Sequence, residues 1–100
     1  MSLLNARERI DVEVSLAKFI KRGKMFTSWE FYRDGLRLPS NRTQVTKHLL
    51  NLLYEGNRLF NAWAVIKVGG TNGPFLFFKV WEFGFVARKV KQIEKELINA

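Results

Sequence analysis

The chain has 100 residues, of which 47% are hydrophobic and 14% aromatic, so it can form a single domain over residues 1–100 with its own core. Its 17 Lys and Arg against 9 Asp and Glu give a net charge of +8, which favours polyanionic partners. With no Cys and a single His, disulfides are excluded, and neither a metal nor a cofactor is expected.

Compartment and chemistry are constrained by what the sequence lacks. No apolar run is long enough to span a bilayer, and charges interrupt the opening MSLLNARERI, where a secretory signal needs an apolar stretch. We therefore expect a cytoplasmic protein without a membrane partner, associated with the nucleoid or made by a virus or plasmid inside its host. No paired carboxylates, nucleophile with a base or phosphate-binding glycine motif is present, so no enzyme is predicted.

The first predicted helix covers residues 5–22, and Gly23 can end it in the left-handed conformation. Apolar residues recur at helical spacing, and this spacing predicts a core face made of Ile10, Val14, Ala17 and Ile20 or Phe19, with Leu16 alongside.

A helix-turn-helix arrangement follows. The motif TSWE is a capping box that predicts a helix over residues 28–34, ended by Gly35. Phe26, just before it, is interpreted either as packing on this helix or as part of a short strand. Pro39 then disfavours helix for the residue before it, and Ser40 is predicted to cap the next helix, residues 41–55. Two helices joined by a tight turn match a helix-turn-helix.

Residues 58–83 have the aromatic and branched composition of a β-hairpin, with its tip at residues 69–74. We expect Val68 to pair with Phe75. This register places Trp63, Val65, Leu76, Phe78 and Val80 on one face and Phe60, Ile66, Phe77, Trp81 and Phe83 on the other. Both faces are apolar and both need covering, one by the first three helices and the other by the last helix or another copy of the protein.

The last predicted helix covers residues 86–98. Its apolar side chains follow a heptad spacing, and the resulting seam consists of Val86, Val90, Ile93 and Leu97. The seam is compatible with packing on the hairpin of the same chain or with dimerisation, and we expect a homodimer.

The order of helix, helix-turn-helix, hairpin and helix resembles the winged helix-turn-helix superfamily of DNA-binding domains. The resemblance covers nearly the whole chain and is carried by TSWE, LPSNRT and LLNLLYEGNRLF. It implies an α+β winged-helix fold whose third helix enters the major groove of double-stranded DNA, while the hairpin lies against the adjacent backbone. The implied function is that of a small homodimeric transcriptional regulator.

Polar and basic side chains on the third helix suit this role, because amides can pair with adenine and guanidinium or ammonium groups with guanine. No carboxylate occurs between Asp34 and Glu55. The candidate contacts on and beside this helix are Ser40, Asn41, Arg42, Thr43, Gln44, Lys47, His48 and Asn51. Further candidates, mostly for phosphate, are Arg37, Arg58, Lys67 and Lys79. The hairpin tip carries no Lys or Arg, so whether it touches DNA stays open.

Two other functions are compatible with the sequence. The apolar hairpin and its uncharged tip would also suit a protein-interaction module, since a fold does not determine a function. The aromatic residues Trp29, Tyr32 and Tyr54 would suit stacking on the bases of RNA or of a single strand, although such residues are common in cores.

Overall fold

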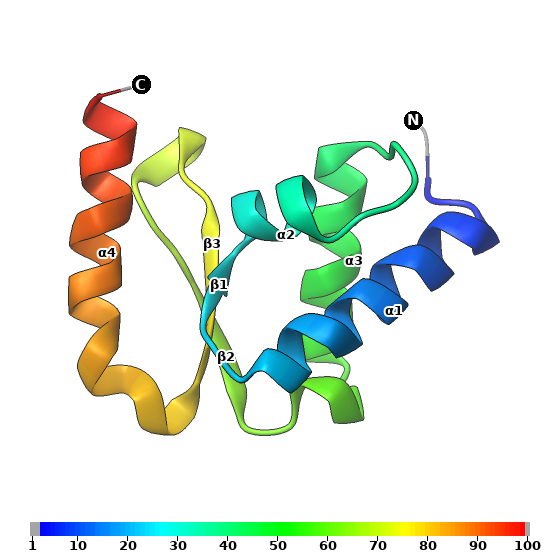
Figure 1. The fold of residues 1–100 in the computed structure, drawn as a ribbon, viewed down its shortest axis with the longest axis horizontal. Coiled ribbons are helices and arrows are strands. Elements are labelled where there is room, and N and C mark those ends of the chain that lie inside the picture. Colours follow the sequence, from blue (N-terminus) through cyan, green and yellow to red (C-terminus); the bar gives the residue numbers. More distant parts are fainter. Residues whose placement is uncertain (1–2, 100) are drawn as a thin grey trace.

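Four helices and a three-stranded antiparallel sheet make up the part of the chain that the computed structural model describes, residues 3–99 (Figure 1). The helices are α1 (Ala6–Arg22), α2 (Ser28–Asp34), α3 (Arg42–Tyr54) and α4 (Phe83–Ile98). The strands are β1 (Phe26–Thr27), β2 (Trp63–Lys67) and β3 (Phe75–Lys79). This architecture confirms the α+β class. Helix α4 begins at Phe83, whereas the sequence predicted a start near Val86.

Side-chain caps define where the first three helices begin. The predicted capping box is present at α2: the Glu30 N–H donates to Thr27 Oγ1 at 3.1 Å, and the Thr27 N–H donates to Glu30 Oε1 at 3.3 Å. A second box joins Asn5 and Glu8 at α1. The cap of α3 is Asn41, whose Oδ1 accepts from the Gln44 N–H at 3.1 Å, so the prediction of Ser40 as the cap is wrong by one residue.

The buried face of α1 differs from the predicted one. Its buried residues are Val12, Ser15, Leu16 and Phe19, whereas Ile10 and Val14 are 61% and 51% exposed. The inward side includes the polar Ser15, whose hydroxyl bonds to a backbone carbonyl. The prediction is thus confirmed for Leu16 and Phe19 and wrong for Ile10 and Val14, because apolar periodicity counts a polar residue such as Ser15 as evidence of exposure.

The sheet has the strand order β1-β3-β2, with both pairs antiparallel. Phe26 pairs with Phe77, so the short-strand interpretation of Phe26 is confirmed. In the hairpin Lys67, not Val68, pairs with Phe75, so the predicted register is wrong by one residue. A shift of one residue exchanges the faces on which a strand's side chains lie. Val65 and Phe77 therefore share one face, and Ile66 and Leu76 share the other.

The loop of the hairpin explains this register. The Val68 N–H donates to the Pro74 carbonyl at 3.0 Å, so the ladder continues for one residue beyond the assumed end of the strand. Gly69 has φ +77°, a value that L side chains rarely adopt. At Gly73 a Cβ atom would lie 1.5 Å from the Val68 carbonyl oxygen, so only glycine fits there.

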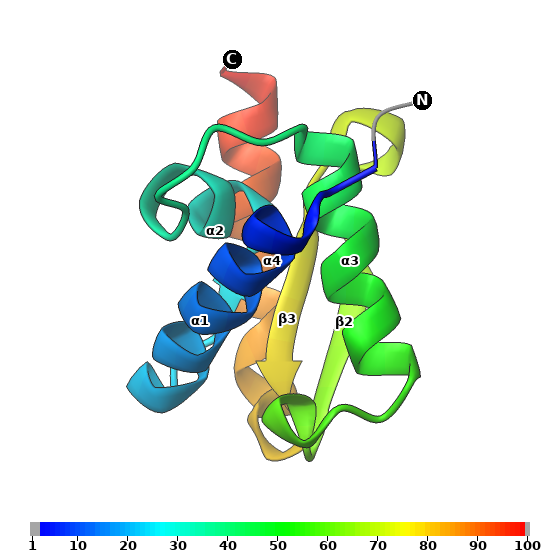
Figure 2. The ribbon, with the colours of Figure 1, turned by 90° about the vertical axis from the view of Figure 1, so that its right-hand side faces the viewer.

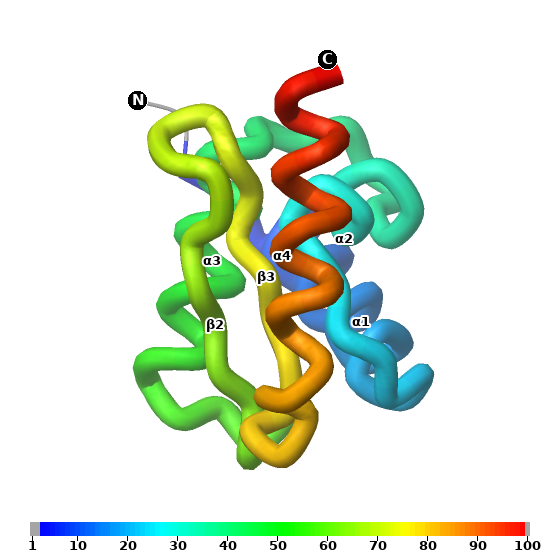
Figure 3. The backbone as a smooth tube through the Cα atoms, turned by 90° about the vertical axis from the view of Figure 1, so that its left-hand side faces the viewer, coloured from blue at the N-terminus to red at the C-terminus, as the bar shows by residue number. Residues whose placement is uncertain are grey.

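Helices cover both faces of the sheet, as expected from its two apolar faces (Figures 2 and 3). On one face α1, α2 and α3 enclose the larger core, which includes Leu16, Phe31, Leu49 and Phe77. On the other face α4 packs over Leu76 and Phe78. The seam expected for dimerisation, Val86, Val90, Ile93 and Leu97, packs on the hairpin of its own chain, which is the alternative that the sequence left open.

Replacing Phe77 by Ala tests this arrangement. Phe77 is fully buried, and its ring stacks on Phe26 at 5.1 Å and on Phe60 at 5.5 Å between centroids. We expect the substitution to lower the free energy of unfolding by about 3–5 kcal/mol, because it leaves a cavity in the core. Urea unfolding followed by circular dichroism measures the change. The matched control is Phe83→Ala, at an exposed Phe, with an expected loss below about 0.5 kcal/mol; equal losses would contradict the packing described.

Candidate nucleic-acid interface

Helix α3 buries one side and exposes the other. Val45, Leu49 and Leu52 are buried in the larger core. The exposed residues at its start and along its outer side are Asn41, Arg42, Thr43, Lys47 and Asn51, while Ser40 and Gln44 are half-buried. Most of the candidate contacts predicted on this helix are therefore accessible, and none of the exposed ones is acidic.

The turn between α2 and α3 is held by polar groups of α1 and α2. The Asp11 carboxylate accepts from the N–H groups of Arg37 and Leu38, each at 3.0 Å. The Ser15 hydroxyl donates to the Gly35 carbonyl at 2.5 Å, and the Tyr32 hydroxyl donates to the Ser40 carbonyl. These bonds satisfy backbone groups that a loop would otherwise leave to water, and they orient the start of α3 relative to α1 and α2.

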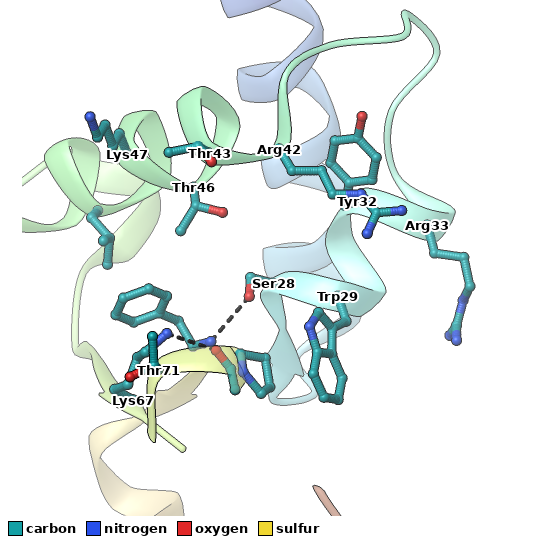
Figure 4. Close-up of a pocket in the computed structure, with 14 residues that line it drawn as sticks. Ser28, Trp29, Tyr32, Arg33, Arg42, Thr43, Thr46, Lys47, Lys67 and Thr71 are labelled. Carbon is teal, nitrogen blue, oxygen red and sulfur yellow. Dashed lines mark hydrogen bonds between the residues drawn. The ribbon is translucent and has the colours of Figure 1, made fainter. Parts of the chain in front are cut away.

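An open groove of about 1060 Å³ lies between α2, the first half of α3 and the hairpin (Figure 4). Figure 4 shows side chains from all three elements around it, with the Ser28 hydroxyl accepting from the Phe75 N–H at 3.1 Å. Four cationic residues are part of its lining, and no Asp or Glu is among its described lining residues; the cations are Arg33, Arg42, Lys47 and Lys67. The groove thus attracts anions.

The cations of the groove are held in different ways. The Arg42 guanidinium lies 4.8 Å from the centre of the Tyr32 ring, and the Lys67 ammonium lies 4.6 Å from that of Phe75. Lys67 also donates to the Gly73 carbonyl at 2.7 Å. Arg33 is hydrogen-bonded to Asp34 at 3.0 Å, which raises the pKa of Arg33 and lowers the pKa of Asp34. Arg33, although exposed, is therefore partly neutralised by Asp34. Arg42 and Lys47 are also exposed.

Several predicted contacts lie elsewhere. Arg37 lines a separate hollow of about 450 Å³ beside α1. Arg58 belongs to a short 3-10 turn after α3, and Lys79 lies at the end of β3 away from the hairpin tip, 5.5 Å from the Trp81 ring. The structure therefore does not gather these three residues in the groove, because their positions depend on the hairpin register and on loop paths rather than on helix periodicity.

His48 is the one candidate on α3 that faces inward. Its side chain is 19% exposed, and its Nε2 atom lies 3.5 Å from the Glu13 Oε2 atom on α1. Nε2 is buried and has no hydrogen-bond partner in the described part of the chain. His48 is thus less accessible than the exposed candidates on this helix, because it lies against α1.

Other groove residues were not predicted from the sequence. Thr46 follows Arg42 by four residues, one helical turn, so a stricter use of helix spacing could have found it. Ser28, Arg33 and Thr71 also line the groove, but they come from α2 and the hairpin loop. Only the packing of these elements against α3 brings them there.

Within residues 3–99 no group of side chains is arranged to hold a metal ion, and no helix there is long and apolar enough to cross a membrane. Comparison of the chain with models of protein families, with curated proteins and with solved structures found no match. The features of the molecule that bear on its function are therefore the groove and the exposed side of α3.

Replacing Asp11 by Ala tests how the turn is held. We expect the free energy of unfolding to fall by about 1 kcal/mol, because two backbone N–H groups lose a charged acceptor at a partly exposed site. Amide hydrogen exchange should accelerate at Arg37 and Leu38 in particular. Glu94→Ala, at an exposed carboxylate of α4, is the control and should change neither quantity. Unchanged exchange at Arg37 and Leu38 in the Asp11 variant would contradict the role of this carboxylate.

Proposed function

We propose that this protein binds double-stranded DNA, with α3 entering the major groove and the hairpin lying against the adjacent backbone. The observation that carries the proposal is the groove described above, in which cations adjoin the exposed side of α3 and no described lining residue is acidic. Such a surface releases counterions from a polyanion and gains affinity in doing so.

The arrangement of the elements supports the proposal. Two helices joined by a turn, a β1-β3-β2 sheet and a hairpin next to the second of those helices are similar to a winged helix-turn-helix. This likeness concerns the fold alone, and a fold hosts more than one function. Support for the function itself comes from the side chains that α3 exposes.

The dimensions and side chains of α3 suit a DNA groove. Its 13 residues make a helix of about 20 Å, and the major groove, about 12 Å wide, admits an α-helix. Thr43 and Lys47 are exposed one turn apart, where they would meet a base edge or a phosphate. Arg42 lies at the first turn, where base contacts are made in helix-turn-helix docking.

The hairpin would contribute mainly through its backbone. Lys67 already gives one of its three hydrogens to the Gly73 carbonyl and thereby holds the loop. The tip itself has Gly, Thr and Asn but no charged side chain. The seam expected to join two copies is covered within the chain, so the proposal describes one copy bound at one half-site.

Replacing Lys47 by Ala should weaken binding to every duplex alike. If Lys47 contacts one phosphate, the slope of log K against log salt should become shallower by about 0.9. Fluorescence anisotropy with a random duplex over a salt series measures this. Lys91→Ala, an exposed Lys of α4 away from the groove, is the matched control and should leave the slope unchanged. Equal effects of the two variants would indicate nonspecific attraction by net charge.

Replacing Arg42 by Ala tests base reading. Duplexes bound by the wild type are first selected from a random pool and sequenced. On the preferred sequence we expect the variant to lose about 1–3 kcal/mol of binding free energy and to tolerate a change at one base pair, because a guanidinium can pair with guanine in a bidentate manner. An equal loss on preferred and random duplexes would show that Arg42 contacts only the backbone.

A second candidate function is favoured by a different surface. Ile10, Val14 and Leu38 are exposed and line the hollow beside α1, which would suit a protein partner. Absence of binding to random duplex at low salt, even at tens of micromolar protein, would favour this protein-interaction function over DNA binding.

A further inference from the structure

The turn from β3 into α4 exposes four large apolar side chains. Val80 is 51% exposed, Trp81 67%, Phe83 70% and Phe85 68%. We call these four residues the aromatic knob. They lie in the 3-10 turn Val80–Glu82 and the first turn of α4. Leaving three aromatic rings in water is costly, and exposed apolar surface of this extent marks an interaction site.

The aromatic knob lies apart from the candidate DNA-binding surface. In Figure 1 the turn between β3 and α4 is at the end of the molecule opposite the hairpin tip and the start of α3. None of its four residues lines the groove or the hollow beside α1. A partner at the aromatic knob is therefore separate from the proposed function.

Basic residues surround the aromatic knob. The Lys79 ammonium lies 5.5 Å from the centre of the Trp81 ring and would be 3.0 Å from a Cβ atom at Gly23, which places it against the end of α1. The end of α1 and the residues just after it include the exposed Lys21, Arg22 and Lys24. Arg88 follows Phe85 by three residues on the same side of α4.

Carboxylates are scarce in the same region. The sequence has no Asp or Glu from residue 14 to residue 29 and only Glu82 from residue 56 to residue 93. Glu82 is half-buried, and its carboxylate accepts from the Lys79 N–H at 3.3 Å. Glu30 of α2 also reaches α4, where it pairs with Lys89 at 3.1 Å. The cations named above still outnumber the carboxylates around the aromatic knob, which favours an anionic occupant.

The exposed rings of the aromatic knob point in different directions. Phe83 and Phe85 are two residues apart in α4, so helical geometry directs them to nearly opposite sides. Phe83 lies near Phe78, with ring centroids 6.4 Å apart, while Trp81 lies beside Lys79. Rings that spread around the end of a helix suit insertion into a soft surface better than docking of a peptide, which needs a groove.

A second copy of the chain fits this surface less well. A stable interface buries about 800 Å² on each partner, whereas three aromatic side chains at this exposure offer roughly 300–500 Å². The rest of such an interface would have to come from the surrounding Lys and Arg residues. Two copies would then bring like charges together.

We propose that the aromatic knob docks on an anionic lipid surface, with Trp81, Phe83 and Phe85 inserted at the level of the headgroups. Trp and Phe are the residues that peripheral proteins bury at this depth, and nearby Lys and Arg add attraction to anionic lipids. The sequence-based expectation of no membrane partner rested on the absence of a spanning segment, and a protein that lies on the surface needs none.

Vesicle binding at physiological salt tests the proposal. The full chain is mixed with vesicles of phosphatidylcholine and phosphatidylserine, or of phosphatidylcholine alone, and bound protein is measured by sedimentation. We expect binding to the anionic vesicles and a loss of about tenfold or more in the variant carrying Phe83→Ser and Phe85→Ser. The variant carrying Lys91→Ala and Lys95→Ala, with two exposed cations removed elsewhere on α4, should bind like the wild type.

Fluorescence distinguishes insertion from loose attraction. Wild-type emission should shift to the blue with anionic vesicles, and Trp81→Phe should abolish the shift while retaining binding, since Trp63 is buried in the larger core and Trp29 lines the groove. Equal vesicle binding by the wild type and the Phe83 and Phe85 variant would overturn the proposal. So would a dimeric mass in light scattering that this variant reduces to the 11.7 kDa chain, because a second copy would then cover the aromatic knob.

Discussion

The apolar character of both faces of the β2–β3 hairpin determines the arrangement of the other elements. Phe77 points to one side of the sheet and its neighbours Leu76 and Phe78 to the other, and all three are buried. Because neither side can face water, α1, α2 and α3 must cover one face and α4 the other. The hairpin thus becomes the middle layer of the molecule, and α3 is left with its outer side beside the hairpin loop.

Polar contacts determine the path of the chain into α3, which apolar burial alone does not. The core accounts for which side of α3 is buried, but not for the path of the chain into it. Asp11 and Ser15 supply that constraint by bonding to the backbone between α2 and α3, and Ser28 ties the start of α2 to β3. The groove is consequently bounded by elements that are each attached to a neighbour, which suits a surface that must present several cations at once.

Local signals in the sequence predicted much of this fold. The capping box of α2, the glycine at the end of α1 and the covering of both hairpin faces were predicted and are confirmed. The predictions that were wrong depend on contacts between distant residues. The burial of Val12 and Ser15 in place of Ile10 and Val14 follows from packing between helices, and the hairpin register follows from the Val68–Pro74 bond. Periodicity within one segment carries no information about these contacts, so the groove residues of α2 and the loop could not be predicted either.

We propose that one surface, formed by α3 and the hairpin loop, meets the duplex. The most direct measurement is a titration of the isotopically labelled protein with a duplex, followed by the shifts of its backbone amide resonances. We expect the largest changes at Arg42, Thr43, Lys47 and Thr71, with little change along the outer side of α4. Changes centred on Arg37 and α1, or on the basic residues of α4, would contradict it.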